Sequence, residues 1–302
     1  MGQVQGGPRP VAGRRARPVA QYTLLAAPLL FVGAFLLVPL ALTLAASFWE
    51  RAGFWVRPAF TLRWYEQFVA GARLFVLERS LVVAAAVTVL GLLLAYPIAY
   101  VLSMRARPER ARVVLLLFTI PFLVNYVIRT FSWAYLLGRT GPVNRALLAV
   151  GVADRPVDWL LFSNFSVVVG LLASYMPVMI YPLFLALAGI DRRLVEASWL
   201  LGAGPATTFR RVTLPLSMPG VFAAVIFGFV GSFGESAVPI ILGGVGYQLM
   251  GNTITSALDV LNYPLAAAMS SAVVAVMLAF LAAWYVAFDL RAFLGKALQW
   301  RY

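Results

Sequence analysis

The sequence predicts an all-α, polytopic membrane protein with six transmembrane helices. Its 302 residues are 62% hydrophobic and only 12% charged. Soluble domains are about 45 to 50% apolar and about 25% charged, so a larger soluble core does not account for the excess. The apolar residues also gather in runs long enough to cross a hydrocarbon layer of about 30 Å at about 1.5 Å per residue.

Six apolar runs are separated by polar connections. They cover residues 24–48, 81–104, 113–137, 165–189, 216–243 and 265–288. The fifth run is the least regular, because Gly228, Gly231, Gly234 and Pro239 interrupt it, and such residues weaken or break a helix.

The arginines indicate the orientation of these helices. The net charge is +13, and Lys296 is the only lysine among 24 basic residues. If the N-terminus lies inside, the inner segments hold 15 basic residues and the outer loops 8, with Arg129 inside the third run. This bias follows the positive-inside rule and predicts that both termini are cytoplasmic.

The two ends of the chain differ from the apolar part. Residues 1–22 are rich in Gly, Pro and Arg, and we expect a disordered, basic cytoplasmic tail. Residues 23–60 form the first transmembrane helix and the start of an outer loop, because the run is too long for the apolar part of a signal peptide. Residues 289–302 form a cytoplasmic tail.

The missing residue types exclude several kinds of chemistry. Without Cys or His there is no thiolate nucleophile, no imidazole base and no Cys or His ligand for a metal. No cluster of carboxylates stands in the runs either, so a membrane-embedded enzyme has no evident catalytic set and we expect no metal site. The basic surplus is explained by topology and does not indicate nucleic acid.

Residues 190–215 form a polar interval with features of helix ends. Asp191 can cap a helix, and Gly202 can end it in the left-handed conformation. Gly204 and Pro205 can start a second helix, since proline suits the first helical position. The interval therefore predicts a short helix, a tight turn and a second helix at the membrane surface.

The first of these helices would carry an apolar stripe. Leu194, Ala197 and Leu201 fall on one face, with Val195 and Trp199 on its flank. This stripe either rests on the protein's own bundle or packs against a partner outside the lipid.

The same interval contains the residues Glu196-Ala197-Ser198, then Gly202, then Leu214-Pro215. This pattern resembles the "EAA" signature of permease subunits of ATP-binding-cassette (ABC) importers. Ser198 stands where a second alanine is usual. The resemblance implies a type I importer permease fold over residues 61–288, with residues 190–215 as the cytoplasmic coupling loop.

Within that family the chain is most similar to spermidine/putrescine-type permeases. The supporting segments are 60–65, 120–122, 129–133, 175–182, 217–220 and 234–244. The resemblance implies a polyamine as cargo, while iron, phosphonates, opines or amino-acid-like solutes remain open.

The resemblance also implies partners and a location. In such importers Glu196, Ala197, Ser198, Gly202, Leu214 and Pro215 belong to the loop that couples to a separate ATP-binding subunit, present in two copies and holding ATP-Mg. A second, homologous permease, an extracytoplasmic solute-binding protein and the lipid of a bacterial cytoplasmic (inner) membrane complete the surroundings. This chain itself has no P-loop around its single lysine, so we expect no ATP hydrolysis and no bound cofactor.

Two ionisable residues, Arg129 and Glu235, fall inside the apolar runs. Each costs free energy in lipid and should face the bundle interior, a water-filled path or a partner. An ion pair between them is one possible arrangement. Two roles are open for Glu235: it lines a pathway or gate, or it has a structural role. Arg129 is either a structural anchor or a pathway residue. Asn125, Tyr126 and Tyr175 could bind cargo or bridge helices.

An ATPase-independent secondary transporter is the rival function. It would need an ion-coupling relay, for which two ionisable residues are few.

Overall fold

The computed structural model describes residues 26, 28–53 and 55–288. The predicted tails, residues 1–22 and 289–302, and the start of the first apolar run at residue 24 lie outside this part. Within it, five helical runs are long and apolar enough to cross a membrane: Pro28–Ala46, Arg73–Met104, Asp158–Ala188, Pro205–Phe233 and Tyr263–Val286. A bent pair, Pro108–Pro121 with Tyr126–Ala149, makes a sixth. The prediction of an all-α protein with six membrane-crossing segments is confirmed.

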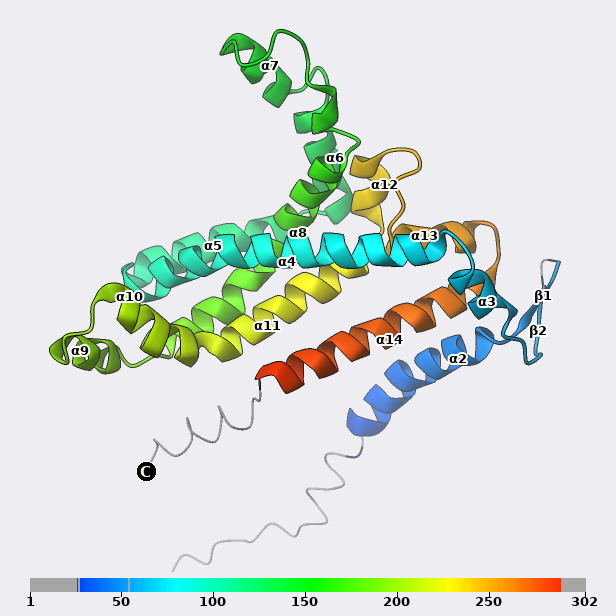
Figure 1. The fold of residues 1–302 in the computed structure, drawn as a ribbon, viewed down its shortest axis with the longest axis horizontal. Coiled ribbons are helices and arrows are strands. Elements are labelled where there is room, and N and C mark those ends of the chain that lie inside the picture. The colour runs from blue at the N-terminus through cyan, green and yellow to red at the C-terminus, as the bar shows by residue number, and fades with distance from the viewer. Residues whose placement is uncertain (1–25, 27, 54, 289–302) are drawn as a thin grey trace, which may run out of the picture.

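The first span leads into a small cap at one end of the molecule. The elements in this region are the π-helix η1 (Gly33–Leu37), α2 (Val38–Ala46), β1 (Glu50–Ala52), β2 (Trp55–Arg57) and α3 (Arg63–Val69). The two strands form an antiparallel hairpin in which Arg51 lies opposite Val56. We refer to this as the hairpin end (Figure 1).

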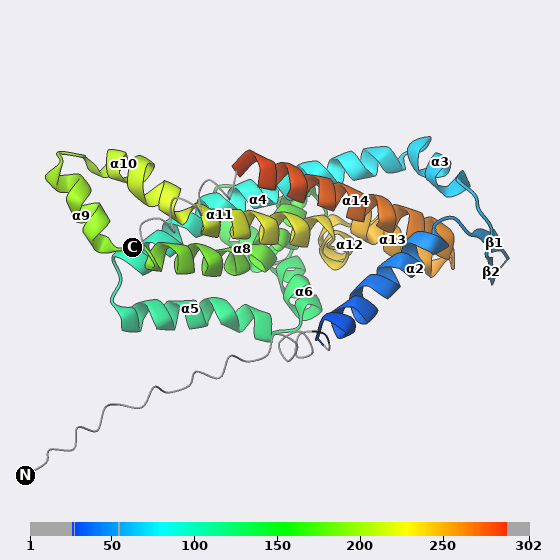
Figure 2. The same cartoon turned by 90° about the horizontal axis from the view of Figure 1, so that it is seen from below.

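The remaining elements form the bundle and its opposite end. They are α4 (Arg73–Met104), α5 (Pro108–Leu123), α6 (Tyr126–Leu137), α7 (Pro142–Ala149), the 3-10 helix η2 (Asp158–Leu160), α8 (Asn164–Ala188), α9 (Arg192–Leu200), α10 (Pro205–Thr208), the π-helix η3 (Phe209–Thr213), α11 (Leu214–Phe233), α12 (Ala237–Gly243), α13 (Met250–Asp259) and α14 (Tyr263–Phe288). Helices α9 and α10 lie at the end of the long axis opposite the hairpin, which we call the α9 end (Figures 1 and 2).

The core lies where α4, α8 and α11 pack together, with α14 beside them (Figure 2). Towards the α9 end, buried Ala95 and Ala99 of α4 meet Leu183 and Leu187 of α8 and Ala224 of α11. Small side chains on one helix against leucines on the next allow close approach of helices in lipid, where packing rather than the hydrophobic effect favours association.

The first span does not belong to this core. Its most apolar stretch has no buried residue, and the bundle helix that α2 mainly contacts is α14. Figure 1 shows it diverging from the bundle away from the hairpin end. Its apolar side chains are therefore left for lipid or for another chain.

The prediction of one continuous third helix over residues 113–137 is wrong. Helix α5 ends at Leu123, and α6 starts at Tyr126 after a bend of 90°. Pro121 has no backbone N–H for a helical bond, Val124 is extended, and Asn125, with φ −51° and ψ 131°, is not helical. The Asn125 side chain then caps α6 by accepting from the Val127 N–H (2.8 Å).

The fifth run is also broken, at the position that its glycines indicated. Helix α11 stops at Phe233, and the short α12 follows after Gly234, so residues 216–243 are not one helix. Proline at position 239 is tolerated because it lies in the first turn of α12, where its missing N–H has no helical acceptor.

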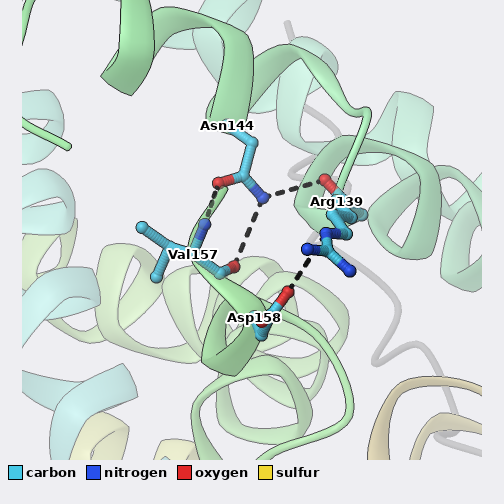
Figure 3. A network of polar contacts seen from close by, with 5 residues as sticks. Arg139, Asn144, Val157 and Asp158 are labelled. Carbon is cyan, nitrogen blue, oxygen red and sulfur yellow. Dashed lines mark hydrogen bonds and ion pairs between the residues drawn. The ribbon is translucent and has the colours of Figure 1, made fainter. Parts of the chain in front are cut away.

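A lobe of residues 138–163 extends from α6 and projects from the bundle (Figure 1). Asn144, which is only 1% exposed, joins two parts of this lobe. The Asn144 Nδ2 donates to the carbonyls of Gly138 (3.0 Å) and Val157 (3.3 Å), and its Oδ1 accepts from the Val157 N–H (2.7 Å), as Figure 3 shows. An exposed ion pair joins Arg139 and Asp158 at 3.5 Å nearby.

Candidate coupling loop and pathway cluster

The coupling loop has the local structure that its helix-end residues predict. The Asp191 side chain caps α9 by accepting from the Arg193 N–H (2.9 Å). Gly202 follows α9 in the left-handed region, with φ +80°, and Pro205 is the first residue of α10. The Gly202 N–H donates to the Trp199 carbonyl (2.9 Å), which satisfies one of the carbonyls at the end of α9.

The departure from the signature at Ser198 has a structural role. Its hydroxyl lies 2.8 Å from the hydroxyl of Thr208, which is buried, and also donates to the Val195 carbonyl at 2.7 Å. The contact fastens α9 to α10 across the turn. Alanine could not make it.

The sequence predicts a second helix of the loop at the membrane surface. In the structure this helix is continuous with the span that follows it. Residues Pro205–Phe233 form one helical run that includes η3. Pro215 lacks an N–H near the start of α11, and the π-turn of η3 directly before it takes up the irregularity. Leu214 and Pro215 therefore connect the loop directly to the bundle.

Helix α9 presents large apolar side chains to the outside. Leu200 and Leu201 are 90% and 88% exposed, and Trp199 and Leu194 are also exposed. Glu196 and Ala197 lie on the same exposed helix. Of the two arrangements open for the apolar stripe, the structure favours a surface available to a partner over one resting on the protein's own bundle.

Arg129 and Glu235, the two charged residues of the apolar runs, contact adjacent residues of α8. The Arg129 guanidinium donates to the Pro121 carbonyl (2.8 Å) and to the Ser174 hydroxyl (3.4 Å). The Tyr175 hydroxyl donates to Glu235 Oε2 (2.8 Å). Within the described residues the one ion pair joins Arg139 and Asp158, so the structure relates Arg129 and Glu235 through α8.

Glu235 stands at the break between α11 and α12. Its Oε1 accepts from the N–H groups of Ser236 (3.0 Å) and Ala237 (2.9 Å), which start α12. The ring of Tyr175 reaches Glu235 by lying against Gly231, where a Cβ would be only 2.3 Å from the ring. The carboxylate is thus half-buried and held on both oxygens.

The structure brings together part of the candidate pathway set. Arg129 contacts Ser174 and Glu235 contacts the adjacent Tyr175, whereas Asn125 is the cap of α6 and Tyr126 is an exposed residue of its first turn. The Pro121 carbonyl, which accepts from Arg129, is not among the residues predicted from the sequence. The sequence does contain a signal for the helix break that exposes this carbonyl. Pro121 is followed four residues later by Asn125, which can cap a helix, and such a pair marks the end of one helix and the start of the next.

Comparison with known protein families places these features in context. Residues 87–293 match the model of the family described as binding-protein-dependent transport system inner membrane component. The match includes the coupling loop, Glu235 and most of the bundle core. The chain belongs to this family.

A curated relative supports the assignment over most of the permease. The chain is 33% identical over 254 residues to the spermidine/putrescine transport system permease protein PotB of Haemophilus influenzae. The aligned region covers 83% of this chain and 88% of PotB.

Solved structures share the fold of the permease. A chain from the crystal structure of a bacterial ABC transporter involved in the import of the acidic polysaccharide alginate superposes with a TM-score of 0.69. The sequence identity is 14%, and the match covers 90% of this chain and 96% of the other. A bacterial alginate ABC transporter in complex with an alginate pentasaccharide-bound periplasmic protein gives 0.68 at 16% identity, covering 89% and 93%.

These findings confirm the resemblance to ABC importer permeases. The protein is a permease subunit of an ABC importer and a multi-pass inner-membrane protein. Its curated relative is named as a transport system permease protein.

Proposed function

We propose that this permease forms half of the translocation pathway for a small polar solute, and that the solute is a polyamine such as spermidine or putrescine. The proposal of a polyamine is supported by the similarity to PotB, which extends over most of both chains. Another small solute handled by the same importer class is the alternative.

The observation that carries the transport mechanism is the placement of α9. It presents Trp199, Leu200 and Leu201 at one end of the bundle, and Ser198 fastens it to the helical run Pro205–Phe233. We propose that a separate ATP-binding subunit, present in two copies and holding ATP-Mg, docks on this face. Movement of α9 would then reach the break at Gly234 through one continuous helix.

The other partners follow from the same arrangement. A second, homologous permease supplies the other half of the pathway, and an extracytoplasmic solute-binding protein delivers the cargo at the hairpin end. In this assembly both termini and α9 lie on the cytoplasmic side.

Glu235 is the proposed acidic group of the pathway. Its carboxylate is half-buried at a helix break, the kind of irregular backbone that lines cavities in membrane proteins. A negative charge there suits a cationic amine. We propose that Arg129, which donates to the Pro121 carbonyl, anchors the neighbouring break of α5 and α6.

The assembly is tested by purifying a tagged copy from its native membrane in mild detergent and identifying the retained chains by mass spectrometry. We expect an ATP-binding subunit and a second permease, and ATP-driven uptake of spermidine after reconstitution. Recovery of this chain alone, with uptake driven by an ion gradient, would contradict the proposal.

The role of the loop is tested by the same substitution at two nearby glycines. Gly202→Val places a β-branched residue at φ +80°, at a cost of about 1–3 kcal/mol. Gly204→Val is the control, because Gly204 has φ −73° and ψ 170°, which suit valine, and no atom lies within 4 Å of a Cβ at either site. We expect Gly202→Val to lose the ATP-binding subunit and uptake while Gly204→Val keeps both. Equal behaviour of the two variants would argue against the shape of the turn as the docking determinant.

A further inference from the structure

The first turn of α13 lies directly against the backbone that ends α11. A Cβ at Gly251 would be 2.3 Å from the Glu235 carbonyl oxygen, 2.7 Å from its carbonyl carbon and 2.9 Å from the Gly234 carbonyl oxygen. Ordinary contacts between an aliphatic carbon and a carbonyl oxygen are about 3.3–3.6 Å. A methyl group at position 251 therefore requires a relative movement of about 1 Å.

Helix α13 is held in place and has little freedom to make that movement. The Met250 N–H donates to the Ser80 hydroxyl of α4 (2.8 Å), and Met250 is fully buried. The buried Asn252 side chain accepts from the Leu249 N–H and donates to the Tyr247 carbonyl, both at 2.7 Å. Buried hydrogen bonds of this kind are costly to break, so the strain falls on the Glu235 segment.

The Glu235 carboxylate depends on the position of its own backbone. Its Oε1 is fixed by the next two N–H groups of the chain, and its Oε2 by the Tyr175 hydroxyl of α8. A shift of the Glu235 backbone relative to α8 changes the second contact but carries the first with it. The direction of the Glu235 carboxylate therefore depends on where α13 holds the break between α11 and α12.

We propose that Gly251 is a positioning residue for Glu235: because it lacks a side chain, α13 seats the α11–α12 break so that the carboxylate meets Tyr175 and faces the cargo. The inference rests on the proposed role of Glu235 in the pathway. Gly251 itself need not touch the cargo.

Gly234 supplies a matched control. It is adjacent to Glu235 in the chain, yet a Cβ there would meet only the Val230 carbonyl oxygen at 3.6 Å and Met277 Cε at 3.8 Å. Its φ of −88° suits alanine. The remote Gly251→Ala should therefore be harmful, whereas the adjacent Gly234→Ala should be tolerated.

The test measures spermidine taken up per ATP hydrolysed by the reconstituted full transporter with saturating loaded binding protein. This ratio does not depend on the amount of folded protein, so a purely structural defect leaves it unchanged. We expect Gly251→Ala to lower it at least about fivefold, since misplacement of a functional group by 1 Å has effects of this order or larger. Glu235→Gln should lower it as well, and Gly251→Ala with Glu235→Gln should be no worse than Glu235→Gln alone.

Several results would overturn the inference. They are an unchanged ratio in Gly251→Ala, an equal loss in Gly234→Ala, losses that multiply in the double variant, or an unchanged ratio in Glu235→Gln. The proposed substrate is judged separately, because it fails if the unmodified transporter shows no ATP-driven spermidine uptake.

A second readout needs no cargo. The chain has no cysteine, so Glu235→Cys gives a unique thiol in this subunit. Its rate of modification by a trimethylammonium methanethiosulfonate, measured on this chain by mass, should change severalfold when Gly251→Ala is added and stay constant with Gly234→Ala. A rate unaffected by Gly251→Ala would show that position 251 does not place residue 235.

Discussion

At the scale of single residues, three polar side chains of the apolar runs form hydrogen bonds with backbone groups at the ends of broken helices. Arg129 donates to the Pro121 carbonyl near the end of α5, Asn125 accepts at the start of α6, and Glu235 accepts at the start of α12. A helix that stops inside an apolar layer leaves backbone groups that water cannot satisfy. These residues supply the missing partners, and the same breaks are the proposed lining of the pathway.

The contact between Tyr175 and Glu235 gives a prediction at this scale. Tyr175→Phe keeps the ring against Gly231 but removes the donor to a carboxylate, so we expect a loss of about 1–2 kcal/mol in the free energy of unfolding. Thermal unfolding of the purified complex would measure it. Tyr285→Phe, at an exposed position on α14, is the control, and an equal effect of the two would contradict the assigned contact.

At the scale of elements, two connections relate the coupling loop and the lobe to the bundle. The run Pro205–Phe233 connects the coupling loop to the core as one helical run, whereas the chain bends by 90° after α5, so that α6 packs against α8 and α12 and leads to the lobe of residues 138–163. In the proposed mechanism, the first connection transmits movement of α9 along a helix. Within the lobe that follows the second connection, the side chain of Asn144 is buried.

The lobe allows a comparison of a buried amide with an exposed ion pair. Asn144→Ala leaves half-buried backbone groups of Gly138 and Val157 without a side-chain partner and should destabilise the lobe by about 1–3 kcal/mol. Arg139→Ala should cost no more than about 1 kcal/mol, because both partners are more than 70% exposed and solvent screens the pair. Hydrogen exchange of residues 138–163 would rise strongly only in Asn144→Ala. A comparable rise in Arg139→Ala would show that the ion pair, not the amide, holds the lobe.

At the scale of the whole molecule, the bundle has two chemically different ends. The α9 end presents exposed leucines and Trp199, and the hairpin end presents β1 and β2 with exposed Trp55 (Figure 1). The distribution of arginines predicts that the α9 end is cytoplasmic. Each end is therefore available to a different partner.

The orientation can be tested on single cysteines, since the chain has none of its own. In intact cells without their outer membrane, a membrane-impermeant maleimide should label Trp55→Cys but label Leu201→Cys only after lysis. The chain is expressed without the proposed ATP-binding subunit, which would cover Leu201, so that both positions stay exposed. Labelling of Leu201→Cys before lysis would reverse the predicted topology.

Three features could be predicted from the sequence alone: the class of the protein, the number of apolar segments and the local structure of the coupling loop. These follow from composition, run length and helix-end residues such as Asp191, Gly202 and Pro205, which act within a few positions along the chain. Only the tertiary structure decided that Arg129 and Glu235 meet neighbouring residues of α8, that Ser198 holds Thr208, and that Gly251 touches the Glu235 backbone. The physical reason is that these contacts depend on the distance and rotation between packed helices. Neither is determined by the apolar periodicity of one segment.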